Sequence, residues 1–294
     1  MSDLKSFEEY LLSEKHSSQN TVQSYLRDVG QFISYCEETA GINYLAAETK
    51  DIENYLSYLA AIGKSEATCS RMLASSRCFY KYLVLKGAVS SNPAGGIRAQ
   101  KKKQQLPGIL ETSEVTLLLA QPSGNDYKSI RDKAMLEVLY ATGMRVSELL
   151  ELDVSDVNIS IGIIHMKNSR HERIVPLYPE AVRAVTNYLH GVRSGLVADD
   201  DSGKLFTNMN GQPMSRQGFW KIIKHYSETA GIKKDITPHT LRHSFAAHLL
   251  ENGAQLKYIK EMLGHSDVSS TQIYAQVVKN KYTRDYSRFH PLAK

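Results

Sequence analysis

The first part of the chain, residues 1–90, alternates apolar and polar side chains with the period of an α-helix. The pattern is clearest over residues 21–38, 52–59 and 66–86, where apolar residues recur three or four positions apart. Asn20 is a candidate N-cap for the first of these helices, and glycines near the other ends favour helix termination. We therefore predict a bundle of about four helices, with a core that includes Leu73, Phe79, Tyr82 and Leu83.

The composition changes at residues 91–108. This segment, SNPAGGIRAQKKKQQLPG, contains two prolines, three glycines and the run Lys101, Lys102 and Lys103, without apolar periodicity. Such a composition is typical of a linker, and the lysines fit either a solvated linker or a basic strap along phosphates. The change predicts an N-terminal domain at 1–90, a basic linker at 91–108 and a C-terminal domain at 109–294.

The C-terminal domain returns to helical periodicity, with one interruption. Residues 157–175 contain two runs rich in β-branched residues around a polar stretch that begins at Lys167, and this pattern predicts a β-hairpin. Helices resume at Pro179 and are broken near Gly211, at 235–238 and at Gly264. The predicted fold class is therefore mainly α, with a helical bundle followed by a mostly helical domain that holds a small β-hairpin or sheet.

Composition and charge indicate a globular protein but say little about its function. The chain has 294 residues, 42% hydrophobic and 23% charged, which fits two globular domains. A net charge of +5 slightly favours an anionic partner. Three cysteines without C-x-x-C spacing, no signal-peptide pattern and no long apolar run predict reduced thiols, no membrane span and a cytoplasmic location.

Three segments carry candidate chemistry. Arg145 follows Gly143 at the expected start of a helix, where its charge opposes the helix dipole, so it either pairs with Glu148 one turn on or receives an external anion. In the segment PHTLRHSFA, His239 and Arg242 are three residues apart and share a helix face behind Pro238. Taken alone, a packed core histidine is the simpler interpretation of His239.

The third segment places His265 after Gly264 and a tyrosine, Tyr274, nine residues further on. The pair His239 and His243 lacks the further ligands of a zinc site, so we expect neither a metal nor a cofactor. Arginines bind phosphate oxygens, and their charge would lower the pKa of a nearby tyrosine and make it a nucleophile. A hairpin lysine could protonate a departing 5′-hydroxyl. Together these residues predict metal-free phosphodiester chemistry.

These motifs resemble those of the tyrosine recombinase, or phage-integrase-type, family, and most of all those of bacterial Xer recombinases. The resemblance covers essentially the whole chain. The family's ordered catalytic pattern is matched by Arg145, Lys167, His239, Arg242, His265 and Tyr274. One departure concerns Lys167, which commonly follows a glycine in relatives but here follows Met166.

The resemblance implies a site-specific DNA recombinase whose two domains clamp duplex DNA. Tyr274 would form a 3′-phosphotyrosyl link without ATP, Arg145 and Arg242 would hold the phosphate, and Lys167 would be the general acid. His239 and His265 would assist with protons and oxyanion contacts, and Glu148 would orient Arg145.

The family also implies partners. Four protomers, from this recombinase alone or with a related one, would assemble on two DNA sites, and the segment after Tyr274 would dock into a neighbour or pack on its own domain. Chromosome dimer resolution, with a cell-division DNA translocase, is the expected role. An integrase or resolvase of a mobile element is an alternative, and a catalytically silent DNA-binding protein is an alternative of a different class.

Overall fold

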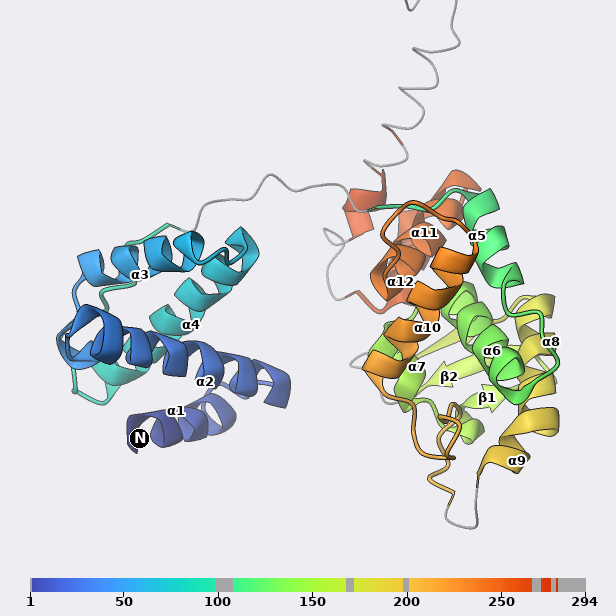
Figure 1. Cartoon of the computed structure of the whole chain (residues 1–294), viewed down its shortest axis with the longest axis horizontal. Helices are drawn as coiled ribbons and strands as arrows, with labels where there is room; N and C mark the ends of the chain where they lie inside the picture. Colours follow the sequence, from blue (N-terminus) through green and yellow to red (C-terminus); the bar gives the residue numbers. More distant parts are fainter. Residues whose placement is uncertain are drawn as a thin grey trace, which may run out of the picture. The chain divides into compact units, whose positions relative to one another are not determined.

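The computed structural model describes residues 2–98, 108–167, 172–197, 201–265, 271–275 and 279. The chain divides into two compact units, Met1–Gln105 and Leu106–Lys294 (Figure 1). Each unit has its own buried core. Lys101, Lys102 and Lys103, and most of the chain after Tyr274, lie outside the described residues. In the described part of the chain, no helix is both long and apolar enough to cross a membrane.

The N-terminal unit is helical throughout its described length. The first predicted helix starts earlier than expected, because Ser18 rather than Asn20 is the N-cap and its hydroxyl accepts from the backbone N–H of Thr21. Beyond Ser34 the same helix continues as a π-helical turn. The elements are α1 (Ser2–Ser13), α2 (Gln19–Ser34), the π-helical turn Tyr35–Ala40, a 3₁₀ turn (Tyr44–Ala46), α3 (Thr49–Ala61) and α4 (Glu66–Leu85).

Packing of α4 against the other helices forms the N-terminal core, as the apolar periodicity predicts. The four expected core residues of α4 are all buried. One buried carboxylate, Asp28 on α2, accepts hydrogen bonds from Arg71 and Ser75 on α4, so the two helices are also joined by a satisfied polar contact. Arg77 donates to the carbonyls of Ala94 and Ile97, which holds the start of the predicted linker against α4.

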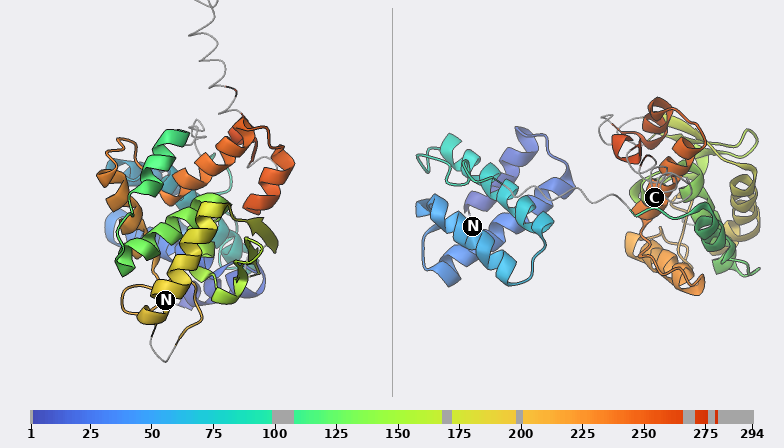
Figure 2. Two further views of the ribbon diagram at one scale, coloured as in Figure 1. Left: turned by 90° about the vertical axis from the view of Figure 1, so that its right-hand side faces the viewer. Right: turned by 90° about the horizontal axis from the view of Figure 1, so that it is seen from above.

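The C-terminal unit combines helices with a small sheet. Figure 2 shows the packing of each unit from two further directions. The elements are α5 (Thr112–Ala120), α6 (Tyr127–Thr142), α7 (Val146–Glu151), a 3₁₀ turn (Val154–Asp156), β1 (Val157–Asn158), β2 (Ile163–Met166), β3 (Arg173–Pro176), α8 (Pro179–Tyr188), a π-helical turn (Leu189–Arg193), α9 (Ser194–Leu196), α10 (Arg216–Thr229), α11 (Pro238–Glu251) and α12 (Leu256–Leu263). The predicted fold class is confirmed.

The sheet has three antiparallel strands in the order β1-β2-β3. The predicted hairpin corresponds to β2 and β3, which pair His165 with Ile174 and Met166 with Arg173. The short strand β1 adds to β2 through Val157 and Ile164. Lys167 directly follows β2 and Arg173 begins β3, so the hairpin holds these two cationic residues at the same end of the sheet.

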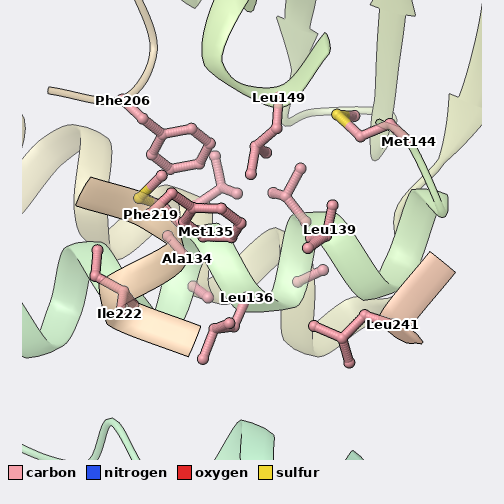
Figure 3. Close-up of a cluster of buried hydrophobic side chains, with 14 of the residues drawn as sticks. Ala134, Met135, Leu136, Leu139, Met144, Leu149, Phe206, Phe219, Ile222 and Leu241 are labelled. Atoms are coloured by element: carbon pink, nitrogen blue, oxygen red, sulfur yellow. The ribbon is translucent and has the colours of Figure 1, made fainter. Parts of the chain in front are cut away.

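Helix α6 is the centre of the C-terminal core. It contacts α5, α7, α8, α11 and β3, and most of its side chains between Ala134 and Leu139 are buried. Figure 3 shows Met135, Leu139 and Leu149 in one apolar cluster with Phe206 and Phe219, which come from distant parts of the chain. The end of α6 is therefore fixed by packing, and the turn that follows it carries the first residues of the candidate site.

Candidate active site

The turn after α6 fixes the position of Arg242. Gly143 ends the helix with a φ of +58°, and a Cβ atom at this residue would come within 2.2 Å of the Phe245 ring on α11. Only glycine therefore allows α6 and α11 to approach this closely. The carbonyl of Gly143 accepts from Nη1 of Arg242 at 2.6 Å, and the carbonyl of Leu263 accepts from Nη2 at 2.8 Å. The buried guanidinium is thus held from two sides.

Arg145 is the N-cap residue of α7, as the sequence predicts. Its backbone N–H donates to Oε2 of Glu148 at 2.7 Å, and its Nη1 lies 3.2 Å from Oε1 of the same carboxylate. The Arg145 side chain remains 43% exposed, whereas that of Glu148 is only 12% exposed. Glu148 therefore orients Arg145 while leaving much of the guanidinium open to an anion from outside.

Arg173, which the sequence analysis does not assign to the site, is the second partner of Glu148. Its two terminal nitrogens lie 3.2 and 3.0 Å from the carboxylate oxygens, and its Nε donates to the carbonyl of Met262 at 2.7 Å. The side chain also fills the space beside Gly264, where a Cβ atom would lie 2.7 Å from Nη1. Arg173 thus connects β3, α7 and the end of α12.

Glu148 and Arg242 both keep their charges although they are largely buried. Burial by itself would raise the pKa of Glu148, but hydrogen bonds from Arg173 and Arg145 outweigh it and hold that pKa below its usual range. Burial, together with the charge of Arg145, lowers the pKa of Arg242 to about 10. Both groups are therefore ionised at neutral pH, and the site offers concentrated positive charge.

His265 follows Gly264, which ends α12 in the left-handed region. Its Nδ1 lies 3.0 Å from the hydroxyl of Thr271. Burial lowers the pKa of His265 to about 4, and the charges of Arg242 and Arg145 add to this effect. His265 is consequently a neutral imidazole at pH 7, able to donate or accept one hydrogen bond without adding charge.

Tyr274 is 1% exposed, and its ring belongs to an apolar cluster with Phe245, Ile259 and Leu263. Its hydroxyl lies 3.0 Å from Nδ1 of His243, a residue that the sequence analysis considers only for zinc. Burial raises the pKa of Tyr274, although Arg242 and Arg145 act to lower it. The expectation that the arginines produce a net lowering is wrong for the protein without DNA, because loss of hydration outweighs their attraction.

Two other predicted residues lie at the edges of this cluster. His239 is exposed, unlike Arg242 on the same helix, and its ring centroid is 6.4 Å from that of His243. Lys167 forms an ion pair with the buried carboxylate of Asp156 at 3.3 Å. Lys167 and Glu148 line one hollow of about 150 Å³, so the lysine borders the cluster from the side of α7.

Within the described residues there is no group of three or more His, Cys, Asp or Glu side chains that could hold a metal ion. The residues brought together are instead two buried or half-buried histidines, three arginines, one glutamate and one tyrosine. Such a set can bind an oxyanion and place a phenol beside it.

The bridging role of Arg173 leads to a stability prediction. Among the described residues, Glu148 pairs with Arg173 and Arg145. Replacing Arg173 with methionine removes one of these two cations from a largely buried carboxylate, so the free energy of unfolding should fall by about 2–4 kcal/mol. The chain has one tryptophan, Trp220 on α10, so its fluorescence during urea unfolding reports on the C-terminal unit.

The matched control for this prediction is Arg183→Met. Arg183 lies on the exposed side of α8, where it pairs with exposed Glu180, and its loss should change stability by less than about 0.5 kcal/mol. Equal effects of the two substitutions would contradict a bridging role for Arg173.

Comparison with known proteins identifies the family. Residues 108–281 match the phage integrase family, and residues 4–87 match the phage integrase N-terminal SAM-like domain. The chain belongs to the phage integrase family. The tyrosine recombinase XerD of Halalkalibacterium halodurans is 42% identical over 99% of this chain and 98% of its own length. That of Oceanobacillus iheyensis is 43% identical with the same coverage. The predicted resemblance is confirmed.

Solved structures of recombinases resemble this recombinase along its length. XerA recombinase is 30% identical, with a TM-score of 0.55 over 99% of this chain and 98% of XerA. XerH, described in a post-cleavage complex with a palindromic difH substrate, is 19% identical. Its TM-score is 0.78 over 97% of this chain and 84% of XerH, which shows a shared fold.

Proposed function

We propose that this chain is a site-specific recombinase that cleaves and rejoins duplex DNA through a covalent link between Tyr274 and a 3′-phosphate. The observation that carries the proposal is a convergence of side chains. Arg242 donates to the carbonyls of Gly143 and Leu263, which lie two residues before Arg145 and His265. The hydroxyl of Tyr274 lies 3.0 Å from His243, the neighbour of Arg242 on α11. Cleavage and ligation through a tyrosine is the activity of this family.

The arginines bind the scissile phosphate. Arg242 uses only part of its N–H donors on the carbonyls of Gly143 and Leu263, so the rest can bind non-bridging oxygens from a fixed position. The Arg145 side chain is exposed and can bind the same phosphate, while the Glu148 carboxylate accepts from its backbone N–H and from Nη1. Preorganised positive charge stabilises the charge that develops on the phosphorane-like transition state.

The tyrosine oxygen attacks phosphorus, and the bond to the 5′-oxygen breaks. Lys167 protonates the departing 5′-oxygen, while His265 and His239 donate hydrogen bonds to the phosphate. In the second half of the reaction, the 5′-hydroxyl of a partner strand attacks the phosphotyrosyl link and releases Tyr274. The energy of the phosphodiester bond is retained in the enzyme–DNA link, so no ATP is consumed.

In this proposal the N-terminal unit binds DNA and the C-terminal unit carries out catalysis. Residues 1–90 form a DNA-binding domain, 91–108 form a linker whose lysines 101–103 follow the DNA backbone, and 109–294 form the catalytic domain. The two domains clamp the duplex. Four protomers, alone or with a related recombinase, act on two sites.

The full-length similarity to XerD proteins supports chromosome dimer resolution as the role, with a cell-division DNA translocase as a further partner. The integrase or resolvase of a mobile element is the alternative. Mapping the genomic sites that the protein binds separates the two, because a single chromosomal site fits the first role and element ends fit the second.

Covalent trapping tests the function directly. A nicked substrate that loses a short fragment on cleavage prevents religation, so the wild-type protein should accumulate a protein–DNA adduct that survives detergent. Mass spectrometry of the digested adduct should place the nucleotide on the peptide that contains Tyr274. Binding without any adduct on the cognate site would instead indicate a catalytically silent DNA-binding protein.

A further inference from the structure

His243 contacts the oxygen atom that reacts. It lies on α11 next to Arg242, and its Nδ1 is 3.0 Å from Oη of Tyr274. The two ring centroids are 5.6 Å apart, and the ring planes are tilted by 50°. The roles set out above supply a proton to the leaving oxygen and give His239 and His265 hydrogen bonds to the phosphate, whereas the contact with Tyr274 offers His243 as an acceptor for the proton of the attacking phenol.

That proton has to leave the tyrosine during the reaction. Burial raises the pKa of Tyr274, so the phenol is protonated at neutral pH. The charged groups that act on it, Arg242 and Arg145, are cations and cannot accept a proton. The imidazole of His243 can accept one, because burial and the neighbouring His239 and Arg242 keep it neutral, with a pKa of about 4.

We propose that His243 is a further catalytic residue, which takes the proton of Tyr274 through Nδ1 as the tyrosine attacks the phosphate. The inference rests on the proposed function, since it requires Tyr274 to be the nucleophile. In cleavage, the Oη–H bond breaks as the Nδ1–H bond forms, and the Oη–P bond forms as the bond from phosphorus to the 5′-oxygen breaks. In ligation, the 5′-hydroxyl gives its proton to the neutral amine of Lys167 as it attacks phosphorus, the Oη–P bond breaks, and the imidazolium returns its proton to Tyr274.

Substrate binding strengthens His243 as a base. The bound phosphate brings negative charge next to the cluster of arginines and histidines, and a nearby negative charge favours the protonated imidazole. The positive neighbours that keep His243 neutral in the free protein are then partly compensated. The pKa of His243 therefore rises when the phosphate binds, which favours proton transfer in the complex with DNA.

Two substitutions separate a base from a residue that only positions the tyrosine. His243→Asn keeps a hydrogen-bonding group near the place of Nδ1 but cannot accept a proton at neutral pH, whereas His243→Ala removes both properties. Each variant is tested on the trapping substrate and on a copy with a sulfur atom at the 5′-bridging position. A thiolate leaves without protonation, so the second substrate bypasses the general acid.

If His243 is the base, both variants should form adduct at least about 100-fold more slowly than wild type on the ordinary substrate. They should remain slow on the sulfur substrate, whereas Lys167→Ala should recover there. Their rates should also rise with pH between pH 7 and 9, as hydroxide replaces the missing base, while the wild-type rate changes little. The surface variant His225→Asn on α10 should match wild type.

Other outcomes overturn the inference. A near-normal rate for His243→Asn would show that the hydrogen bond only positions Tyr274, and faster cleavage by His243→Ala would show that His243 restrains it. If both His243 variants cleaved the sulfur substrate at the wild-type rate, His243 would be the general acid and not the base. Trp220 fluorescence in urea confirms folding, and His243→Asn decides the question if His243→Ala is unstable. Failure of the proposed function is recognised separately, because wild type would then form no adduct on either substrate.

Discussion

Replacing Tyr274 with phenylalanine is expected to abolish the covalent protein–DNA adduct while leaving DNA binding intact. The substitution removes the nucleophilic oxygen and nothing else, and the phenylalanine ring fills the same apolar cluster with Phe245, Ile259 and Leu263. Among the described residues, the hydroxyl is hydrogen-bonded to His243, so its loss should cost only about 1 kcal/mol of stability. Adduct is measured by denaturing gel electrophoresis, and binding by mobility shift.

The matched control is Tyr258→Phe. Tyr258 is on α12 near the same site, but its side chain is about half exposed, so the loss of its hydroxyl should leave the adduct unchanged. Adduct formation by Tyr274→Phe at the wild-type rate would show that another residue is the nucleophile, and Tyr282 and Tyr286 would be the next candidates.

Replacing Arg242 with lysine is expected to slow adduct formation by about 10²–10³-fold. Lysine keeps the charge but lacks the planar fork that binds the carbonyls of Gly143 and Leu263 and the phosphate at the same time. The ammonium would satisfy one carbonyl at the expense of the phosphate. The rate is measured in a single turnover with excess protein, so that a weaker affinity for DNA does not hide the chemical step.

Arg183→Lys is the control for the same change at an exposed position, and it should cleave at the wild-type rate. Urea unfolding followed by Trp220 fluorescence shows how much of any loss in Arg242→Lys comes from instability. A rate within threefold of wild type for a folded Arg242→Lys would remove Arg242 from the phosphate-binding group.

The sequence predicts the parts of this site that are local along the chain. Arg145 and Glu148 are three residues apart, so helix geometry alone brings them together. Pro238 and Thr237 mark the start of α11 by the ordinary preferences of helix N-termini. The order of the six motif residues then identifies the family, although their roles in this chain remain proposals.

The parts that the sequence does not predict depend on contacts between distant segments. From the sequence, Arg173 is predicted only to be part of the hairpin. Its bonds to Glu148 and to the carbonyl of Met262 join segments that are distant along the chain, so no local pattern indicates them. The i, i+4 spacing of His239 and His243 suggests a metal site, whereas the contact of His243 with Tyr274 depends on the fold. The pKa of Tyr274 is mispredicted for the same reason, because its burial is a tertiary property.

The turn at Gly143 has a consequence for the tolerance of the chain to insertions and deletions. The carbonyl of Gly143 holds Arg242, one of the two arginines proposed to bind the phosphate, and the other, Arg145, follows only two residues later. The separation of the two guanidinium groups is therefore set by a single short piece of backbone. Adding or removing one residue there would shift Arg145 relative to Arg242 with no helix able to absorb the change, so the length of this turn is as restricted as the identity of its residues.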